Sequence, residues 1–142
     1  LREPLLLSAA NGSAETILRN PITREPMIEA IRLRCISKTE AFAEKFRAAL
    51  SRREVAIRDF FDIDYAVRTW GLRPHDADMV SIVRSKLAVH GNDPVNVSQE
   101  RLAAVWKQLD TQLKPVLREK DFYGFDLERA FRVVEEMGRR VG

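Results

Sequence analysis

The chain has 142 residues, of which 45% are hydrophobic and 32% are charged, with a formal net charge of +3 at pH 7. These values are typical of one soluble globular domain, and so mild a charge permits binding to polyanions without requiring it. They exclude a membrane-spanning helix, because no apolar run approaches the necessary ~20 residues. The only cysteine, Cys35, excludes an intrachain disulfide framework and favours a cytoplasmic location.

Residues 1–36 have strand character at both ends. The run "PLLLSA" at 4–9 is short and apolar, and "EAIRLRCIS" at 29–37 alternates with a period of two. Turn signals lie between them. We expect two strands joined by a long loop or hairpin, supported by helices or further strands. The alternation turns Cys35 inward as a small buried hydrophobe.

Beyond Ser37 the apolar residues recur at helical spacing. The pattern predicts about five helices, with expected spans of roughly 38–53, 57–70, 76–89, 98–115, and 126 onward. Two tryptophans, Trp70 and Trp106, lie on apolar helical faces and are expected in the core. The aromatic stretch "DFYGFD" at 121–126 is expected to be a loop packed on the bundle. The predicted fold class is α+β, mostly α: a short N-terminal β element of two strands, then a helical bundle.

One lysine, Lys45, lies on or beside the otherwise apolar stripe of the first helix. Asp59 and Asp62 are three residues apart, so both project from one side of the second helix, where Arg58 could pair with Asp62. A short connection makes the two helices antiparallel neighbours, which brings Lys45 towards Asp59 or Asp62. Two interpretations remain open. The ion pairs either only orient the helices, or they fix a lysine that holds a phosphate.

A resemblance favours the second interpretation. A strand leads into "AEKFRAAL" at 43–50, and "RDFFDI" follows at 58–63. Over residues 31–70 this pattern resembles the C-terminal motifs of the AbiEii/AbiGii family of nucleotidyltransferase toxins, from type IV toxin–antitoxin and abortive-infection systems.

The resemblance implies site residues one by one. Lys45 falls on the lysine of the family's third motif, and Asp59 and Asp62 fall on the aspartates of its fourth, which implies a catalytic role for all three. Binding of the nucleotide phosphates is expected from Lys45, Arg58 and Arg47. Two further arginines at the end of the first helix either contact phosphates or only complement the helix dipole; these are Arg52 and Arg53.

The chain departs from the family at the metal site. Related nucleotidyltransferases resemble one another in a Gly-Ser pair followed by carboxylates that bind two Mg²⁺ ions. Gly12 and Ser13 are present, but Thr16 stands where an aspartate is needed, so we expect Asn-Gly-Ser to form only a turn. The "DID" at 62–64 is no metal pair either, because residues two apart on a helix point apart. No metal ligand is therefore assigned, and we expect the metal-binding carboxylates upstream of Leu1.

The resemblance implies a protein that transfers a nucleotide from a nucleoside triphosphate (NTP) to an RNA acceptor, with tRNA expected. Its cofactors would be Mg²⁺ and the NTP, and its partners the RNA and a cognate antitoxin, with no membrane. Residues 1–36 would be the remaining β portion of the nucleotidyltransferase domain and 37–142 the C-terminal helical domain. This part alone is expected to be inactive and to hold no cofactor. The alternative is a non-catalytic helical module that binds RNA or a protein partner.

Overall fold

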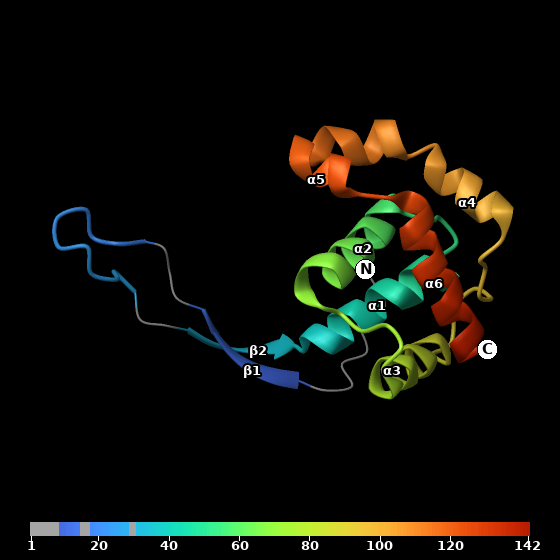
Figure 1. The fold of residues 1–142 in the computed structure, drawn as a ribbon. Coiled ribbons are helices and arrows are strands. Elements are labelled where there is room, and N and C mark those ends of the chain that lie inside the picture. Colours follow the sequence, from blue (N-terminus) through green and yellow to red (C-terminus); the bar gives the residue numbers. More distant parts are fainter. Residues whose placement is uncertain (1–8, 15–17, 29–30) are drawn as a thin grey trace.

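A computed structural model describes residues 9–14, 18–28 and 31–142. The protein is mostly helical, which confirms the mainly α class: a two-stranded antiparallel ribbon projects from a bundle of helices (Figure 1). Among the described residues, no helix is both long enough and apolar enough to pass through a membrane.

The elements have the following bounds. The strands are β1, Ala9–Ala14, and β2, Ile31–Ile36. The α-helices are α1 Lys38–Ser51, α2 Ile57–Trp70, α3 Ala77–Leu87, α4 Gln99–Trp106, α5 Glu119–Gly124 and α6 Leu127–Val141. Between α4 and α5 the chain forms a π-helical turn, η1 Leu109–Leu113, and a 3-10 turn, η2 Lys114–Val116.

The ribbon corrects two expectations. Of the strand predicted at 4–9, residues 4–8 lie outside the described residues, and the observed strand begins at Ala9. Asn-Gly-Ser lies inside β1 rather than in a turn, because it pairs with β2, where Gly12 is opposite Leu33. Ladder hydrogen bonds therefore override the local turn preference of these residues. Cys35 is exposed rather than buried, because the ribbon stands clear of the bundle (Figure 1).

The core lies where α1, α2, α3 and α6 meet. Its largest fully buried apolar side chains come from these helices, from α4 and from η1, namely Phe46, Leu50, Ile57, Phe60, Ile63, Val83, Val105, Leu113, Val134 and Met137. Phe60 of α2 stacks on Phe131 of α6, with ring centroids 5.8 Å apart. Each fully buried side chain of this size stabilises the fold by about 1.5–3 kcal/mol. Apolar packing across these helices is thus what holds α1 and α2 in place.

Local signals define the ends of the core helices. The Ser37 hydroxyl accepts a hydrogen bond from the Glu40 backbone N–H at the start of α1, and the Asp126 carboxylate accepts one from the Arg129 N–H at the start of α6. Gly71 ends α2 in the left-handed region, with φ of +64°, a conformation that favours glycine. The helix predicted at 57–70 is confirmed residue for residue.

The segment after α4 differs from the expectation. The helix predicted at 98–115 ends at Trp106. The π-helical turn η1 and the 3-10 turn η2 follow it. The Gln108 side chain accepts from the Ile57 N–H and donates to the Val55 carbonyl, so it ties this segment to the α1–α2 connection. The stretch at 121–126 is not a plain loop either, because its first part lies in α5.

The two tryptophans were expected in the core, and this expectation was wrong. Trp70 is 53% exposed and Trp106 is 44% exposed. Each is the last residue of its helix. A residue at that position can match the apolar stripe in sequence and still lie beyond the edge of the core.

Candidate functional site

The site is built where α1 and α2 lie against each other. Arg52, just after α1, contacts Asp59 near the start of α2, while Phe42, near the start of α1, contacts Trp70 at the end of α2. The two helices are therefore antiparallel, as the short connection predicted. This arrangement brings the α1 lysine beside the α2 aspartates.

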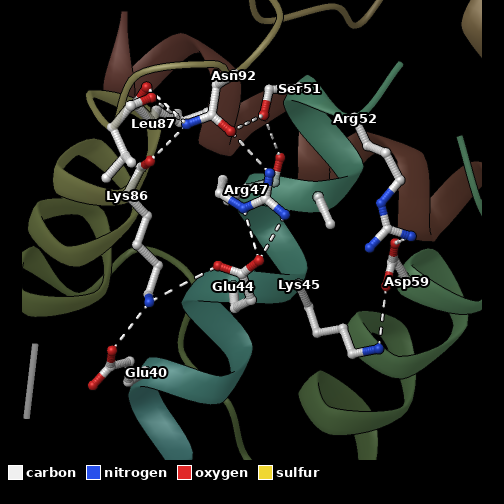
Figure 2. Close-up of polar contacts among 12 residues, drawn as sticks. Glu40, Glu44, Lys45, Arg47, Ser51, Arg52, Asp59, Lys86, Leu87 and Asn92 are labelled. Atoms are coloured by element: carbon white, nitrogen blue, oxygen red, sulfur yellow. Dashed lines mark hydrogen bonds and ion pairs between the residues drawn. The ribbon is translucent and has the colours of Figure 1, made fainter. Parts of the chain in front are cut away.

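Lys45 contacts both aspartates. Its Nζ lies 3.1 Å from Asp59 Oδ1 and 2.8 Å from Asp62 Oδ2, and its link to Asp59 is drawn in Figure 2. The sequence predicted an approach to one or the other carboxylate, and the structure brings both together with the lysine. The proximity is confirmed, while the catalytic role of the three residues stays a prediction.

The two carboxylates differ in burial. The Asp59 side chain is 5% exposed, whereas those of Asp62 and Lys45 are 39% and 38% exposed. Asp59 Oδ2 lies 3.2 Å from Arg52 Nη1. The geometry there is that of an ion pair without a well-aligned hydrogen bond, because Oδ2 accepts none within the described part of the chain. One buried carboxylate thus lies between two half-exposed cations.

The surroundings of Lys45 keep it charged. Partial burial disfavours the ammonium, but the hydrogen bond to Asp62 and the charges of Asp59 and Asp62 outweigh it, so the pKa of Lys45 is raised above its usual value. An ammonium has three N–H donors. The two aspartates occupy two of them, which leaves one donor on a partly exposed cation for an incoming anion.

The other predicted phosphate ligands lie apart from this cluster. Arg47 donates to Glu44 and Asn92, on the side of α1 that faces α3 (Figure 2). Arg58 is exposed, and the described residues contain no ion pair between it and Asp62. Arg52, which the sequence left undecided, is the arginine that joins the site. The phosphate-binding roles of Arg47 and Arg58 stay predictions.

Sequence analysis missed a second and more deeply buried network. Lys86 of α3 places its Nζ 3.0 Å from Glu40 Oε1 on α1, with side-chain exposures of 1% and 0%. Glu44 lies at the edge of this pair, 3.9 Å from the same ammonium (Figure 2). Only the tertiary packing of α1 on α3 reveals the pair, because no periodicity relates residues 46 positions apart. Its burial indicates a structural role.

A third network joins α2 to α6. The buried Asp64 carboxylate accepts hydrogen bonds from Arg68 and from Arg129, and Arg129 also donates to the Gly124 carbonyl. Asp64 therefore faces α6, while Asp62 faces α1. The "DID" carboxylates point to different partners, as the helical spacing predicted.

The site residues fit a phosphate better than a metal ion. Lys45 and Arg52 already neutralise Asp59 and Asp62. In the part of the chain that the structure describes, no group of three or more His, Cys, Asp or Glu side chains could hold a metal. The chemistry that this site offers on its own is the binding of an anion by a fixed ammonium.

Comparison with known proteins adds one finding. The family model described as "Nucleotidyl transferase AbiEii toxin, Type IV TA system" matches residues 5–133. The match spans the lysine and aspartate site and the helices as far as the first half of α6. No curated protein and no solved structure matches the chain.

Proposed function

The chain belongs to the AbiEii family of nucleotidyltransferase toxins, and on that premise we propose that Lys45 contacts the triphosphate of an NTP during nucleotide transfer to an RNA acceptor, with tRNA the expected one. The observation that carries the proposal is the state of the Lys45 ammonium. It is fixed by two carboxylates, protonated, and still 38% exposed.

The proposed roles follow from the contacts. Phosphoryl-type transfer depends on positioning and on neutralising the charge of the phosphates, which a fixed ammonium does without further rearrangement. Lys45 would contact the substrate, while Asp59 and Asp62 would act as positioning residues that hold its Nζ. Arg52 shares Asp59 with Lys45 and would add a second positive charge beside the phosphates. Arg58, exposed at the start of α2, would make a more peripheral contact.

Mg²⁺, when bound with the NTP, supplies neutralisation of the triphosphate. Because Asp59 and Asp62 are engaged by cations, this chain would contact the phosphates through Lys45 and Arg52. The sequence lacks the Gly-Ser-carboxylate motif, with Thr16 at the aspartate position. We therefore propose that this chain binds the nucleotide but does not catalyse its transfer by itself.

Two measurements test the proposal. Calorimetry would measure the binding of each NTP with Mg²⁺ to the chain. Label transfer from each NTP to total tRNA would then be measured for the chain and for the natural gene product. Lys45→Ala is expected to weaken NTP binding and to abolish transfer, and Asp62→Ala is expected to reduce both. Lys107→Ala, at an exposed lysine that is not part of the Lys45, Asp59 and Asp62 cluster, is the matched control and should leave both unchanged.

The outcomes separate the candidate functions. Undiminished binding and transfer in folded Lys45→Ala and Asp62→Ala variants would make the network purely structural. No binding of any NTP, together with binding of tRNA, would favour the non-catalytic RNA-binding module instead. Transfer by the chain alone would refute its expected inactivity.

A further inference from the structure

The surface between α1 and α2 continues from Lys45 towards the other end of the two helices. Lys38 and Lys45 are seven residues apart, so they lie on the same face of α1, about two turns or ~10 Å from each other. Lys45 faces the aspartates of α2, and Lys38 lies over Trp70, with its Nζ 4.8 Å from the ring centroid. The two lysines thus lie along one partly exposed strip, which continues to Arg52, seven residues beyond Lys45 and paired with the same Asp59.

Trp70 is held firmly although it is more than half exposed. Phe42 meets it in an edge-to-face arrangement with ring centroids 5.8 Å apart, and Tyr65 does the same at 5.5 Å. The chain turns away directly after it at Gly71. A large aromatic ring is therefore presented in a fixed orientation beside a cation, which is how proteins hold unstacked bases.

The charges of the strip suit a nucleotide. Lys38, Lys45 and Arg52 contribute +3, and Asp59 and Asp62 contribute −2, which gives a net charge of +1. The strip is therefore electrostatically compatible with the phosphates of a nucleotide.

The other exposed aromatic surface has a different character. A pocket of about 590 Å³ between α4 and the start of α6 is lined by Trp106 and Tyr123, but also by Asp126 and Glu128. Its arginine, Arg129, is already bound to Asp64. Carboxylates repel phosphates. The α1–α2 strip therefore fits a nucleotide better than the pocket beside Trp106 does.

We propose that Trp70 is a stacking platform for a nucleobase, which would take the place of the Lys38 ammonium over the ring, and that the phosphates of the same nucleotide extend along the strip to Lys45. The inference rests on the proposed role of Lys45 and adds the position of the base. The spacing of two helical turns is comparable with the length of a nucleoside triphosphate. The base belongs either to the NTP or to an unpaired nucleotide of the acceptor RNA.

The two tryptophans permit a direct optical test. In Trp106→Phe, Trp70 is the only indole, and in Trp70→Phe, Trp106 is the only one. The emission of each variant would be followed during titration with ATP and Mg²⁺, with inorganic tripolyphosphate, and with a short single-stranded RNA. Affinities of Trp70→Ala, Trp106→Ala and Lys45→Ala would be measured by calorimetry with the same probes.

We expect ATP or the RNA, but not tripolyphosphate, to quench Trp70 while leaving Trp106 unchanged. Trp70→Ala should weaken binding of the base-containing probe roughly 5- to 150-fold, with Trp70→Phe closer to wild type and Trp106→Ala unchanged. Quenching by ATP assigns the base to the NTP, and quenching by RNA alone assigns it to the acceptor.

Two failures are distinguishable. If ATP binds and Lys45→Ala weakens that binding, but Trp70 emission and the affinity of Trp70→Ala do not change, the stacking platform is refuted and the role of Lys45 stands. If neither ATP nor RNA binds, or if Lys45→Ala binds ATP normally, the proposed function itself fails, and the inference that rests on it fails as well.

Discussion

Removal of the Lys86 ammonium tests the most deeply buried ion pair of the fold. Lys86→Met keeps most of the side-chain volume but removes the positive charge that lies 3.0 Å from the buried Glu40 carboxylate. Deleting one partner of such a pair destabilises a protein by about 3–5 kcal/mol, because the buried charge that remains loses the opposite charge beside it. For a chain of this size the loss corresponds to a fall in Tm of about 6–20 °C.

The double variant Glu40→Gln/Lys86→Met separates the pair from packing. It removes both charges, so its free energy of unfolding should lie well above the value expected from adding the two single losses. Contacting residues show coupling energies of about 0.5–3 kcal/mol in such cycles. Glu44, 3.9 Å from the ammonium, is already 32% exposed in the wild type, so we expect its carboxylate to be hydrated in the variants.

Urea unfolding followed by far-UV circular dichroism measures the three variants against wild type. Lys107→Met, at an exposed lysine, is the control and should stay within about 0.5 kcal/mol of wild type. A Lys86→Met protein as stable as this control would refute the reasoning, since the ammonium would then contribute nothing to the packing of α1 on α3.

Three further predictions concern Lys45, Asp126 and Arg101. Because the pKa of Lys45 is raised, its ion pairs should stabilise the fold fully below about pH 10.5 and less as pH rises through the folded-state pKa. Urea unfolding across this range would measure the difference in unfolding free energy between wild type and Lys45→Met. That difference should shrink as the pH rises. Asp126→Ala should destabilise the protein by about 1 kcal/mol in thermal unfolding, whereas Asp126→Asn keeps the cap. The hydrogen bond from the Arg129 N–H lowers the pKa of Asp126, so the advantage of aspartate over asparagine should disappear as pH falls through that pKa, below about 3.8. Arg101→Lys should lose about 1–3 kcal/mol in urea unfolding, because the Arg101 guanidinium donates to the Ala49 carbonyl through both Nε and Nη2 and a lysine has no such fork.

Local pattern was enough to predict the helical part of the site. The apolar spacing and the short connection placed Lys45 opposite Asp59 and Asp62 without any structural information. The sequence also pointed to Lys45 as a paired lysine near the core. The most buried lysine is instead Lys86, whose partner Glu40 depends on how α1 and α3 cross.

Exposure and strand position could not be predicted in the same way. Trp70 and Trp106 match the apolar period, but periodicity does not show whether a further layer covers a helix end. Asn-Gly-Ser has strong turn chemistry, yet its pairing partner is β2, about 20 residues further along the chain. Each difference arises from contacts between segments distant in sequence.

The end of α1 has a consequence for the order in which the protein folds. Its last carbonyl groups are not satisfied locally: Arg101, 52 residues beyond Ala49, donates to Ala49, and the backbone of Asn96 donates to Leu50. Contacts of such high sequence separation require a large loop to close, and chains rich in them fold slowly. Until α4 docks, the end of the helix that carries Lys45 lacks these donors. We therefore expect a nascent or truncated chain that ends before Arg101 to carry the site lysine on a helix whose last carbonyl groups are bonded only to water.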